Sequence, residues 1–223
     1  MPTNALLLGS IGVLAETSDL QRQAFNAAFS EHGLDWCWDA ETYRALLEVP
    51  GGKARIRYYG LARGVEVDVE SLYDAKIAAF ARALRAGVDM RPGIRELIAD
   101  ARSQKMKVAL VSSTDRRQIG MVLDALRGGI SAADFDFVGD RSKVMAVKPA
   151  PDIYRVALRD LGVAAPDAVA LEDTPESAAS PRAVGIRTFA YPGEAARGRA
   201  FTADVGVLDR PDARILSRTA AAA

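Results

Sequence analysis

Short apolar runs that stop at glycine or small polar residues recur along the chain. Five runs have this form: residues 5–8 (ALLL), 107–113 (KVALVSS), 135–138 (FDFV), 168–173 (AVALED) and 186–190 (IRTFA). A strand that is buried on both faces has this continuous apolar character, whereas a strand with one wet face alternates between apolar and polar residues. The pattern therefore predicts the buried strands of a parallel sheet.

Helical periodicity fills the chain between most of these runs. Residues 93–104 place Ile94 and Leu97 on one face, and residues 116–127 and 151–161 follow the same spacing. Apolar residues three or four positions apart form the buried stripe of an amphipathic helix. Strands that alternate with such helices predict a Rossmann-like α/β core, in which helices cover both faces of a parallel sheet.

Residues 17–86 interrupt this alternation, because no strand pattern occurs in them. Helical segments follow one another instead, at residues 18–31, 39–48, 53–63 and 69–86. A helical cap domain inserted after the first strand accounts for this stretch, and the chain returns to the sheet near Arg91-Pro92-Gly93, where proline and glycine favour a turn. We therefore expect a core domain of residues 1–16 plus 91–223 and a cap domain of residues 17–90.

Composition narrows the class of protein. The 223 residues include 29 Lys+Arg and 29 Asp+Glu, so the net charge is zero and gives no support to nucleic-acid binding. The apolar stretches are shorter than a membrane span, and the N-terminus lacks the basic start and the cleavage site of a signal peptide. These features predict a cytoplasmic protein without membrane contact, whose alanine-rich tail, residues 219–223, is expected to fray.

The single cysteine and the single histidine carry little chemistry. One cysteine excludes an internal disulfide, and Cys37, between Trp36 and Trp38, is expected to pack against apolar surface in the cap. His32 follows the helical segment 18–31 and is expected to interact with the last carbonyl groups of that helix. A metal site that needs two histidines is excluded.

Polar residues gather where the predicted strands end. Ser112 and Ser113 follow one run, Glu172 and Asp173 close another, and Lys148 precedes a helix that begins near residue 151. Ligands of open parallel sheets bind at the carboxyl ends of the strands. Hydroxyls and a lysine suit a phosphate group, and adjacent carboxylates suit magnesium. Taken singly, these residues have simpler explanations as helix caps or solvated charges, but together they predict an anion site.

Five segments also give the chain a family resemblance: Gly12-Val13-Leu14-Ala15-Glu16-Thr17, Gly51-Gly52-Lys53-Ala54-Arg55-Ile56, Arg91-Pro92-Gly93-Ile94, Lys148-Pro149-Ala150-Pro151-Asp152-Ile153-Tyr154 and Leu171-Glu172-Asp173-Thr174. The chain resembles the haloacid dehalogenase superfamily of phosphatases from Leu6 to about Gly193, specifically the beta-phosphoglucomutase-like or CbbY-like branch with a helical cap. The resemblance implies the strand order of that family's core and a site between core and cap.

The resemblance breaks at the end of the first strand. In the family this strand ends in Asp-x-Asp, whose first aspartate attacks phosphorus and binds magnesium and whose second transfers protons. This chain has Gly9 and Ile11 there, which can do neither. Ser10 lies between them but has no histidine as its base. With the aspartates gone, Gly9 and Gly12 are expected to let backbone amides approach an anion.

The other groups of the family site are retained. The resemblance implies two sets: the phosphate-binding residues Ser112, Ser113 and Lys148, and the magnesium ligands Asp173 and Glu172. A magnesium site that has lost one carboxylate is expected to bind the ion weakly.

The cap contains candidate substrate contacts. Gln21 stands where close relatives often carry a histidine. Lys53 and Arg57 belong to a segment that resembles the substrate-selecting loop, and their charge suits an anionic group. In the core, Pro181 interrupts the helix after residue 173, which should therefore be short or kinked.

Three functions remain open. The first is a protein that is inactive as an aspartyl phosphatase and binds phosphate or a phosphorylated small molecule in a pocket retained between core and cap. The second is a magnesium-dependent sugar-phosphate phosphatase, a hydrolase that follows a non-standard route. The third is a structural or interaction protein whose pocket is a relic. Gly9 and Ile11 favour the first function, and the retained residues favour the second.

Overall fold

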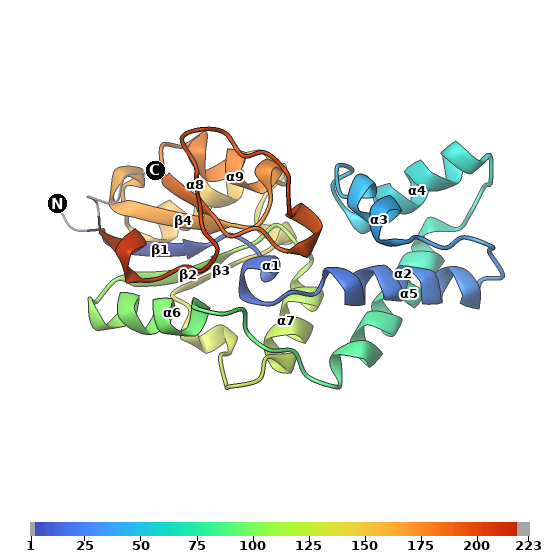
Figure 1. Ribbon diagram of the computed structural model, residues 1–223, viewed down its shortest axis with the longest axis horizontal. Helices are drawn as coiled ribbons and strands as arrows, with labels where there is room; N and C mark the ends of the chain where they lie inside the picture. Colours follow the sequence, from blue (N-terminus) through green and yellow to red (C-terminus); the bar gives the residue numbers. More distant parts are fainter. Residues whose placement is uncertain (1–2, 218–223) are drawn as a thin grey trace. The chain divides into compact units, whose positions relative to one another are not determined.

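The computed structural model describes residues 3–217, and the first of its two compact units is built on a parallel sheet. This first unit contains the chain up to Glu16 and from Val88 onward. Its six strands within the described residues lie in the order β3-β2-β1-β4-β5-β6 (Figure 1): β1 (Ala5–Leu8), β2 (Lys107–Val111), β3 (Phe137–Gly139), β4 (Ala168–Glu172), β5 (Arg187–Ala190) and β6 (Gly206–Val207). All neighbours pair in parallel, which confirms the predicted α/β class and Rossmann-like sheet.

Two strands differ from the sequence prediction. β3 begins at Phe137 rather than at residue 135, because Phe135 ends the short 3-10 helix Ala132–Asp134. β6 escapes the prediction, because the two residues Gly206 and Val207 are too few to show any periodicity.

Helices cover both faces of the sheet, as predicted. In Figure 1, α6 (Ile94–Ser103) and α7 (Arg116–Ala125) lie on one face, and α8 (Asp152–Leu161) and α9 (Pro175–Arg182) lie on the other. α9 has only eight residues and contains Pro181, which confirms the prediction of a short helix. The remaining helical pieces are α1 (Ile11–Leu14) and the 3-10 helices Ala132–Asp134, Arg141–Lys143, Ala165–Asp167, Glu194–Ala196 and Ala213–Leu216.

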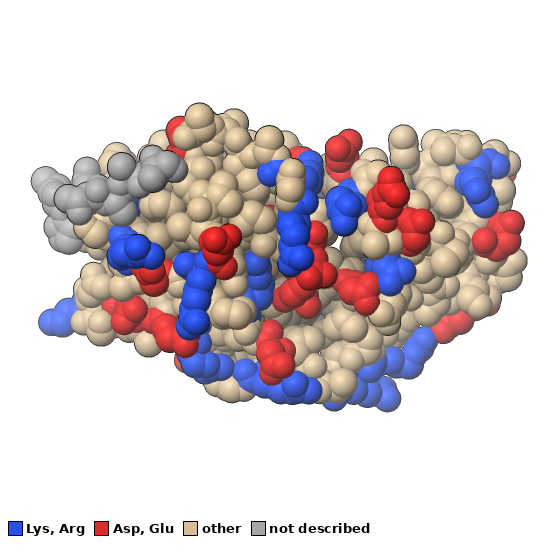
Figure 2. Space-filling model, viewed as in Figure 1, with Lys and Arg blue, Asp and Glu red and all other residues tan. Residues whose placement is uncertain are grey.

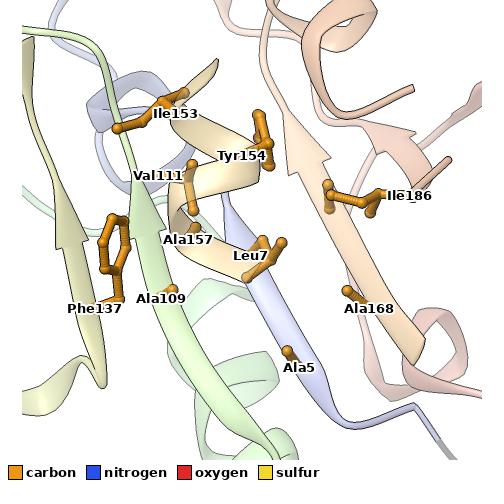
Figure 3. Close-up of a cluster of buried hydrophobic side chains, with 11 residues drawn as sticks. Ala5, Leu7, Ala109, Val111, Phe137, Ile153, Tyr154, Ala157, Ala168 and Ile186 are labelled. Carbon is orange, nitrogen blue, oxygen red and sulfur yellow. The ribbon is translucent and has the colours of Figure 1, made fainter. Parts of the chain in front are cut away.

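Alternate strand residues form the core between the sheet and α8. Leu7 of β1 and Val111 of β2 belong to the same buried cluster as Ile153 and Ala157 of α8 (Figure 3). Leu8, which points to the opposite face, is also fully buried. Burial on both faces explains the continuous apolar runs of the sequence, and each buried leucine contributes about 1.5–3 kcal/mol to folding.

The second compact unit, Thr17–Gly87, is helical. It contains α2 (Ser18–Glu31), α3 (Ala40–Leu46), α4 (Gly52–Arg63) and α5 (Val69–Leu84), and α5 packs on α2 and α4. The unit ends before Val88, earlier than the expected boundary at residue 90, because Val88 forms a parallel β-bridge with Leu126 of the first unit.

Aromatic side chains form the core of the second unit. Trp38 is fully buried, and its ring centroid lies 4.7 Å from that of Phe25 and 4.8 Å from that of Phe29. Trp36 is buried as well. Side chains of an extended segment alternate in direction, so Cys37 between the two tryptophans points outward and is exposed. The prediction that Cys37 packs against apolar surface is therefore wrong.

His32 lies at the end of α2, where the sequence predicts it. Its Nδ1 is 2.9 Å from the carbonyl oxygen of Ala28, and its Nε2 is 3.0 Å from the hydroxyl of Ser71. The contact with a last-turn carbonyl confirms the predicted role. The expected fraying of residues 219–223 lies outside the described residues.

Basic and acidic side chains are intermingled on the face seen in Figure 2, in keeping with the balanced charge of the chain. Within residues 3–217, none of the helices combines the length and the apolar character needed to cross a membrane.

Candidate functional site

The turn after β1 presents no ionisable side chain at either position of the lost aspartates. Gly9 follows the strand, and Ile11 is buried at the start of α1. The amide of Gly9 donates to the carbonyl oxygen of Leu171, at 2.8 Å, and is therefore already used within the sheet. This contact contradicts the expectation that the Gly9 amide faces an anion.

The space beside Gly9 is filled by the carboxylate of Glu172. A Cβ atom built on Gly9 would lie well within 3.0 Å of the Cδ, Oε1 and Oε2 atoms of Glu172, too close for real atoms to coexist. The Glu172 side chain is fully buried at the end of β4. The carboxylate thus occupies the position in which a side chain on residue 9 would begin.

Lys148 and Tyr154 both hydrogen-bond to this carboxylate. Lys148 Nζ lies 2.6 Å from Glu172 Oε1 and also donates to the carbonyl oxygen of Gly9. The Tyr154 hydroxyl, on the first turns of α8 (Figure 3), donates to the same Oε1 at 2.7 Å. Glu172 Oε2 is buried and has no hydrogen-bond partner among the described residues.

The electrostatics of the pair follow from burial. Burial raises the pKa of Glu172, the nearby charge of Asp173 raises it further, and Lys148 opposes both effects. Burial also raises the pKa of the Tyr154 phenol well above its ordinary value, and the neighbouring Glu172 adds to the shift. The tyrosine is therefore a hydrogen-bond donor at neutral pH and not an anion.

Asp173 fills the space above a second glycine. A Cβ atom on Gly12 would collide with Asp173 Oδ2. The Ser10 hydroxyl accepts a hydrogen bond from the Val13 amide at 3.1 Å and also hydrogen-bonds with Asp173. Burial raises the pKa of Asp173, whereas the contact with Ser10 lowers it. The carboxylates of Glu172, the last residue of β4, and of Asp173, the next residue, therefore lie against the two glycines after β1.

The serines after β2 lie beside this arrangement. Ser112 is buried, and its hydroxyl accepts from the Thr114 amide at 3.0 Å. The Ser113 hydroxyl accepts from the backbone amide of Lys148 at 3.4 Å. The N-cap residue of α7 is Asp115. The simpler explanation of Ser112 and Ser113, that they cap this helix, therefore does not hold.

Glu172 and Asp173 do not fit a magnesium site of the family type as they stand. No group of three or more Asp, Glu, His or Cys side chains suited to a metal ion occurs within the described residues. One oxygen of Glu172 already accepts hydrogen bonds from Lys148 and Tyr154, and the ammonium charge of Lys148 would repel a metal cation at that oxygen. Magnesium requires several oxygen ligands in near-octahedral geometry.

Comparison with known proteins assigns the chain to a family. A family model described as haloacid dehalogenase-like hydrolase matches residues 12–191. The chain belongs to the haloacid dehalogenase-like hydrolase family. Among curated relatives, Protein CbbY of Cereibacter sphaeroides is 36% identical over 209 residues, covering 92% of this chain and 91% of that protein. Protein CbbY of Rhodobacter capsulatus is 35% identical over 207 residues, with 91% of each chain covered.

Solved structures agree with this assignment of the hydrolase-like chain to the CbbY and beta-phosphoglucomutase-like branch. CbbY from Rhodobacter sphaeroides in complex with phosphate has a TM-score of 0.84 and 34% identity, covering 94% of this chain and 95% of that one. An aspartate-to-asparagine variant of the same protein, in complex with xylulose-(1,5)bisphosphate, has a TM-score of 0.84 and 35% identity with the same coverage. A beta-phosphoglucomutase from Clostridium difficile, at 19% identity and a TM-score of 0.73, shares the fold.

Arg91 connects two loops of this haloacid dehalogenase-like core. The sequence pattern alone does not reveal this role. Its guanidinium donates to the carbonyl oxygens of Gly12 at 2.9 Å, Tyr191 at 2.8 Å and Pro192 at 2.7 Å. It also lies 3.4 Å from the centroid of the Tyr191 ring. Arg91 therefore ties the turn after β1 to the loop after β5. The contact of Tyr154 with Glu172 is likewise absent from the sequence pattern, although Tyr154 belongs to the segment that begins at Lys148.

The three predicted cap residues of this family member have different surroundings within the second unit. Lys53 pairs with Glu70, and Arg57 is exposed. Gln21 accepts a hydrogen bond from Lys76 of α5.

Lys76 is the most perturbed base of the second unit within the described residues. Its side chain is only 2% exposed, and its Nζ lies 5.0 Å from the ring centroid of Phe25 and 5.1 Å from that of Phe80. Burial lowers the pKa of Lys76 to about 7, and the nearby Arg55 charge adds to the shift. In the sequence, the only sign of this environment is the place of Lys76 on the buried face of α5.

Proposed function

We propose that this haloacid dehalogenase-like protein binds phosphate or a phosphorylated small molecule at the carboxyl ends of β1, β2 and β4, without aspartyl phosphatase chemistry. One observation carries the proposal: Lys148 reaches the end of β1, where Gly9 and Ile11 replace the nucleophile and the proton-transfer group. The cation that can attract a phosphate is retained, and the carboxylate that would attack it is absent.

The neighbouring hydroxyls support an anion as the ligand. The Ser113 hydroxyl contacts the backbone of Lys148. Ser112, the preceding residue, directly follows β2. A lysine with adjacent hydroxyls is a common arrangement for phosphoryl oxygens. The relatives of known structure were solved with phosphate and with xylulose-(1,5)bisphosphate, so a sugar phosphate is the class of ligand that we propose.

One observation favours a second candidate, a magnesium-dependent sugar-phosphate phosphatase with a non-standard nucleophile. The Ser10 hydroxyl hydrogen-bonds with Asp173, so a carboxylate takes the place of the missing histidine as a base. In this alternative Ser10 Oγ bonds to phosphorus, its proton passes to Asp173, and the bond from phosphorus to the leaving sugar oxygen breaks. The sugar oxygen takes a proton from solvent, and a water molecule then hydrolyses the phosphoserine.

Two measurements test these candidates. Titration calorimetry with inorganic phosphate and with xylulose-1,5-bisphosphate, in a chelator, is expected to show binding that Lys148→Met abolishes. Hydrolysis of p-nitrophenyl phosphate with magnesium is expected to stay at the level of a blank. Turnover that Ser10→Ala removes would instead establish the second candidate. A protein that neither binds nor hydrolyses these compounds would have a structural or interaction role.

A further inference from the structure

The Glu172 carboxylate already accepts a hydrogen bond from Lys148, the residue proposed to bind phosphate. We infer that Glu172 is a built-in competitor for Lys148, so that a phosphate group binds only after the Glu172 carboxylate has swung away. We call the arrangement of Glu172 with Lys148 and Tyr154 the Glu172 latch. The inference rests on the proposed function, because it concerns the regulation of the same anion site.

The bonds of Lys148 provide the first step. Its ammonium group contacts Glu172 Oε1 and the Gly9 carbonyl oxygen, and only 8% of its side chain is exposed. The positive charge is therefore already neutralised inside the protein. A phosphate that approached Lys148 with the latch in place would meet a carboxylate at hydrogen-bonding distance from the same nitrogen, and two anions so close repel one another strongly.

The absence of a side chain on Gly9 makes the latch possible. All three terminal atoms of Glu172 lie in the space that a Cβ atom on residue 9 would fill. The obstructing atoms are the far end of a flexible side chain, so even a single methyl group can displace them without moving the backbone. The loss of the nucleophile and the formation of the latch are therefore two consequences of the same glycine.

The latch is held well at one oxygen and poorly at the other. Lys148 and Tyr154 both donate to Oε1, at 2.6 Å and 2.7 Å. Oε2 is buried without a hydrogen-bond partner among the described residues. A buried oxygen without a hydrogen-bond partner raises the free energy of the latched state. The free-energy difference between the latched state and the open state, in which the carboxylate has moved away from Lys148, is therefore smaller. A ligand with a strong preference for the open state can then shift the population.

Three variants release the latch by different means. Gly9→Ala expels the carboxylate by its Cβ atom. Glu172→Gln keeps the shape of the side chain but removes the charge, and Tyr154→Phe removes one of the two donors. Gly120→Ala is the matched control, because a Cβ atom on Gly120 meets nothing within 4 Å. Because the open state is the minor one in the unmodified protein, Gly9→Ala and Glu172→Gln should tighten phosphate binding by about tenfold or more. Tyr154→Phe should tighten it by a smaller factor, and Gly120→Ala should not change it.

The outcomes separate the latch from the site itself. Titration calorimetry with inorganic phosphate in chelator gives the affinities, and circular dichroism shows which variants fold. If the unmodified protein binds phosphate and neither Gly9→Ala nor Glu172→Gln binds it more tightly, the latch is refuted and the anion site stands. If none of the folded proteins binds phosphate, the anion site is refuted, and the latch with it. If Gly9→Ala does not fold, the comparison of Glu172→Gln with the unmodified protein decides the question.

Discussion

Lys148 and Glu172 form an ion pair that is almost wholly removed from water. Nζ lies 2.6 Å from Oε1, with 8% of the lysine side chain and none of the glutamate side chain exposed. Removing one partner of a buried pair strands the other charge, which typically costs about 3–5 kcal/mol. Lys148→Met should therefore lower the free energy of unfolding by about this amount, as measured by urea denaturation.

A double-mutant cycle checks the cause of that loss. Lys148→Met combined with Glu172→Gln leaves no unpaired charge and should recover much of the stability. The exposed pair of Arg159 and Asp160 is the control, since removal of the arginine should cost no more than about 1 kcal/mol. Equal losses from Lys148→Met and Arg159→Ala would show that the Lys148 pair contributes no more than a surface contact.

Restoring both lost aspartates should create phosphatase activity. In the double variant Gly9→Asp and Ile11→Asp, the new carboxylate at residue 9 supplies a nucleophile and displaces Glu172 from Lys148. The aspartate at residue 11 supplies proton transfer, which alone is typically worth ~100-fold or more in rate. We expect magnesium-dependent hydrolysis of p-nitrophenyl phosphate to rise by at least about 100-fold over the unmodified protein.

The matched control places asparagine at both positions, since it has the size of aspartate without a nucleophilic carboxylate. This variant should hydrolyse no faster than the unmodified protein. A folded aspartate variant that remained as inert as its asparagine counterpart would mean that the serines and Lys148 no longer form a working phosphate site.

The regular parts of the fold could be predicted because periodicity reports burial directly. The run at residues 5–8 is β1, and the helical segment at residues 18–31 is α2 with the same bounds. The two-residue strand β6 has no periodicity to detect. The prediction for Cys37 is wrong because the buried tryptophans on either side suggest a buried neighbour, whereas an extended backbone turns every second side chain outward.

The sequence predicts which residues belong to the candidate site, but not how their side chains contact one another. The sequence shows that Gly9 lacks a nucleophile and that Glu172 and Lys148 are present. It does not show that the Glu172 side chain enters the space left beside Gly9 or that Tyr154 holds it there. Side-chain rotamers and contacts between strands that are far apart in the sequence decide these features, and neither can be recognised from a short segment of the chain.

The exposure of Cys37 gives a direct chemical test. The chain contains one cysteine, and Cys37 is free and exposed in the second unit. The folded protein should therefore react completely with a thiol reagent such as dithionitrobenzoate, at nearly the rate seen in denaturant. Cys37→Ser, which should not react, is the control. A thiol that reacts only after unfolding would restore the prediction of a packed cysteine.

The buried amine of Lys76 should make the stability of the second unit depend on pH. Its pKa is about 7 in the folded chain and 10.5 in the ordinary environment. Between these values the unfolded chain carries a proton that the folded chain does not, so the free energy of unfolding rises with pH across this window. The chain has two tryptophans, Trp36 and Trp38, both in the second unit, so their fluorescence follows this unit alone.

Urea unfolding followed by tryptophan fluorescence at pH 7, 8 and 9 measures this dependence. The unmodified protein should gain up to about 1.4 kcal/mol per pH unit relative to Lys76→Met, which fills the space among Phe25, Tyr73 and Phe80 without a titrating group. Other groups titrate equally in both proteins, so the difference between the two slopes isolates Lys76. Lys53→Met is the second control, because Lys53 is exposed and pairs with Glu70, and it should leave the slope unchanged. Parallel slopes for the unmodified protein and Lys76→Met would mean that Lys76 keeps its proton when the unit folds, and that its contacts with Gln21 and the aromatic rings offset the cost of burying the charge.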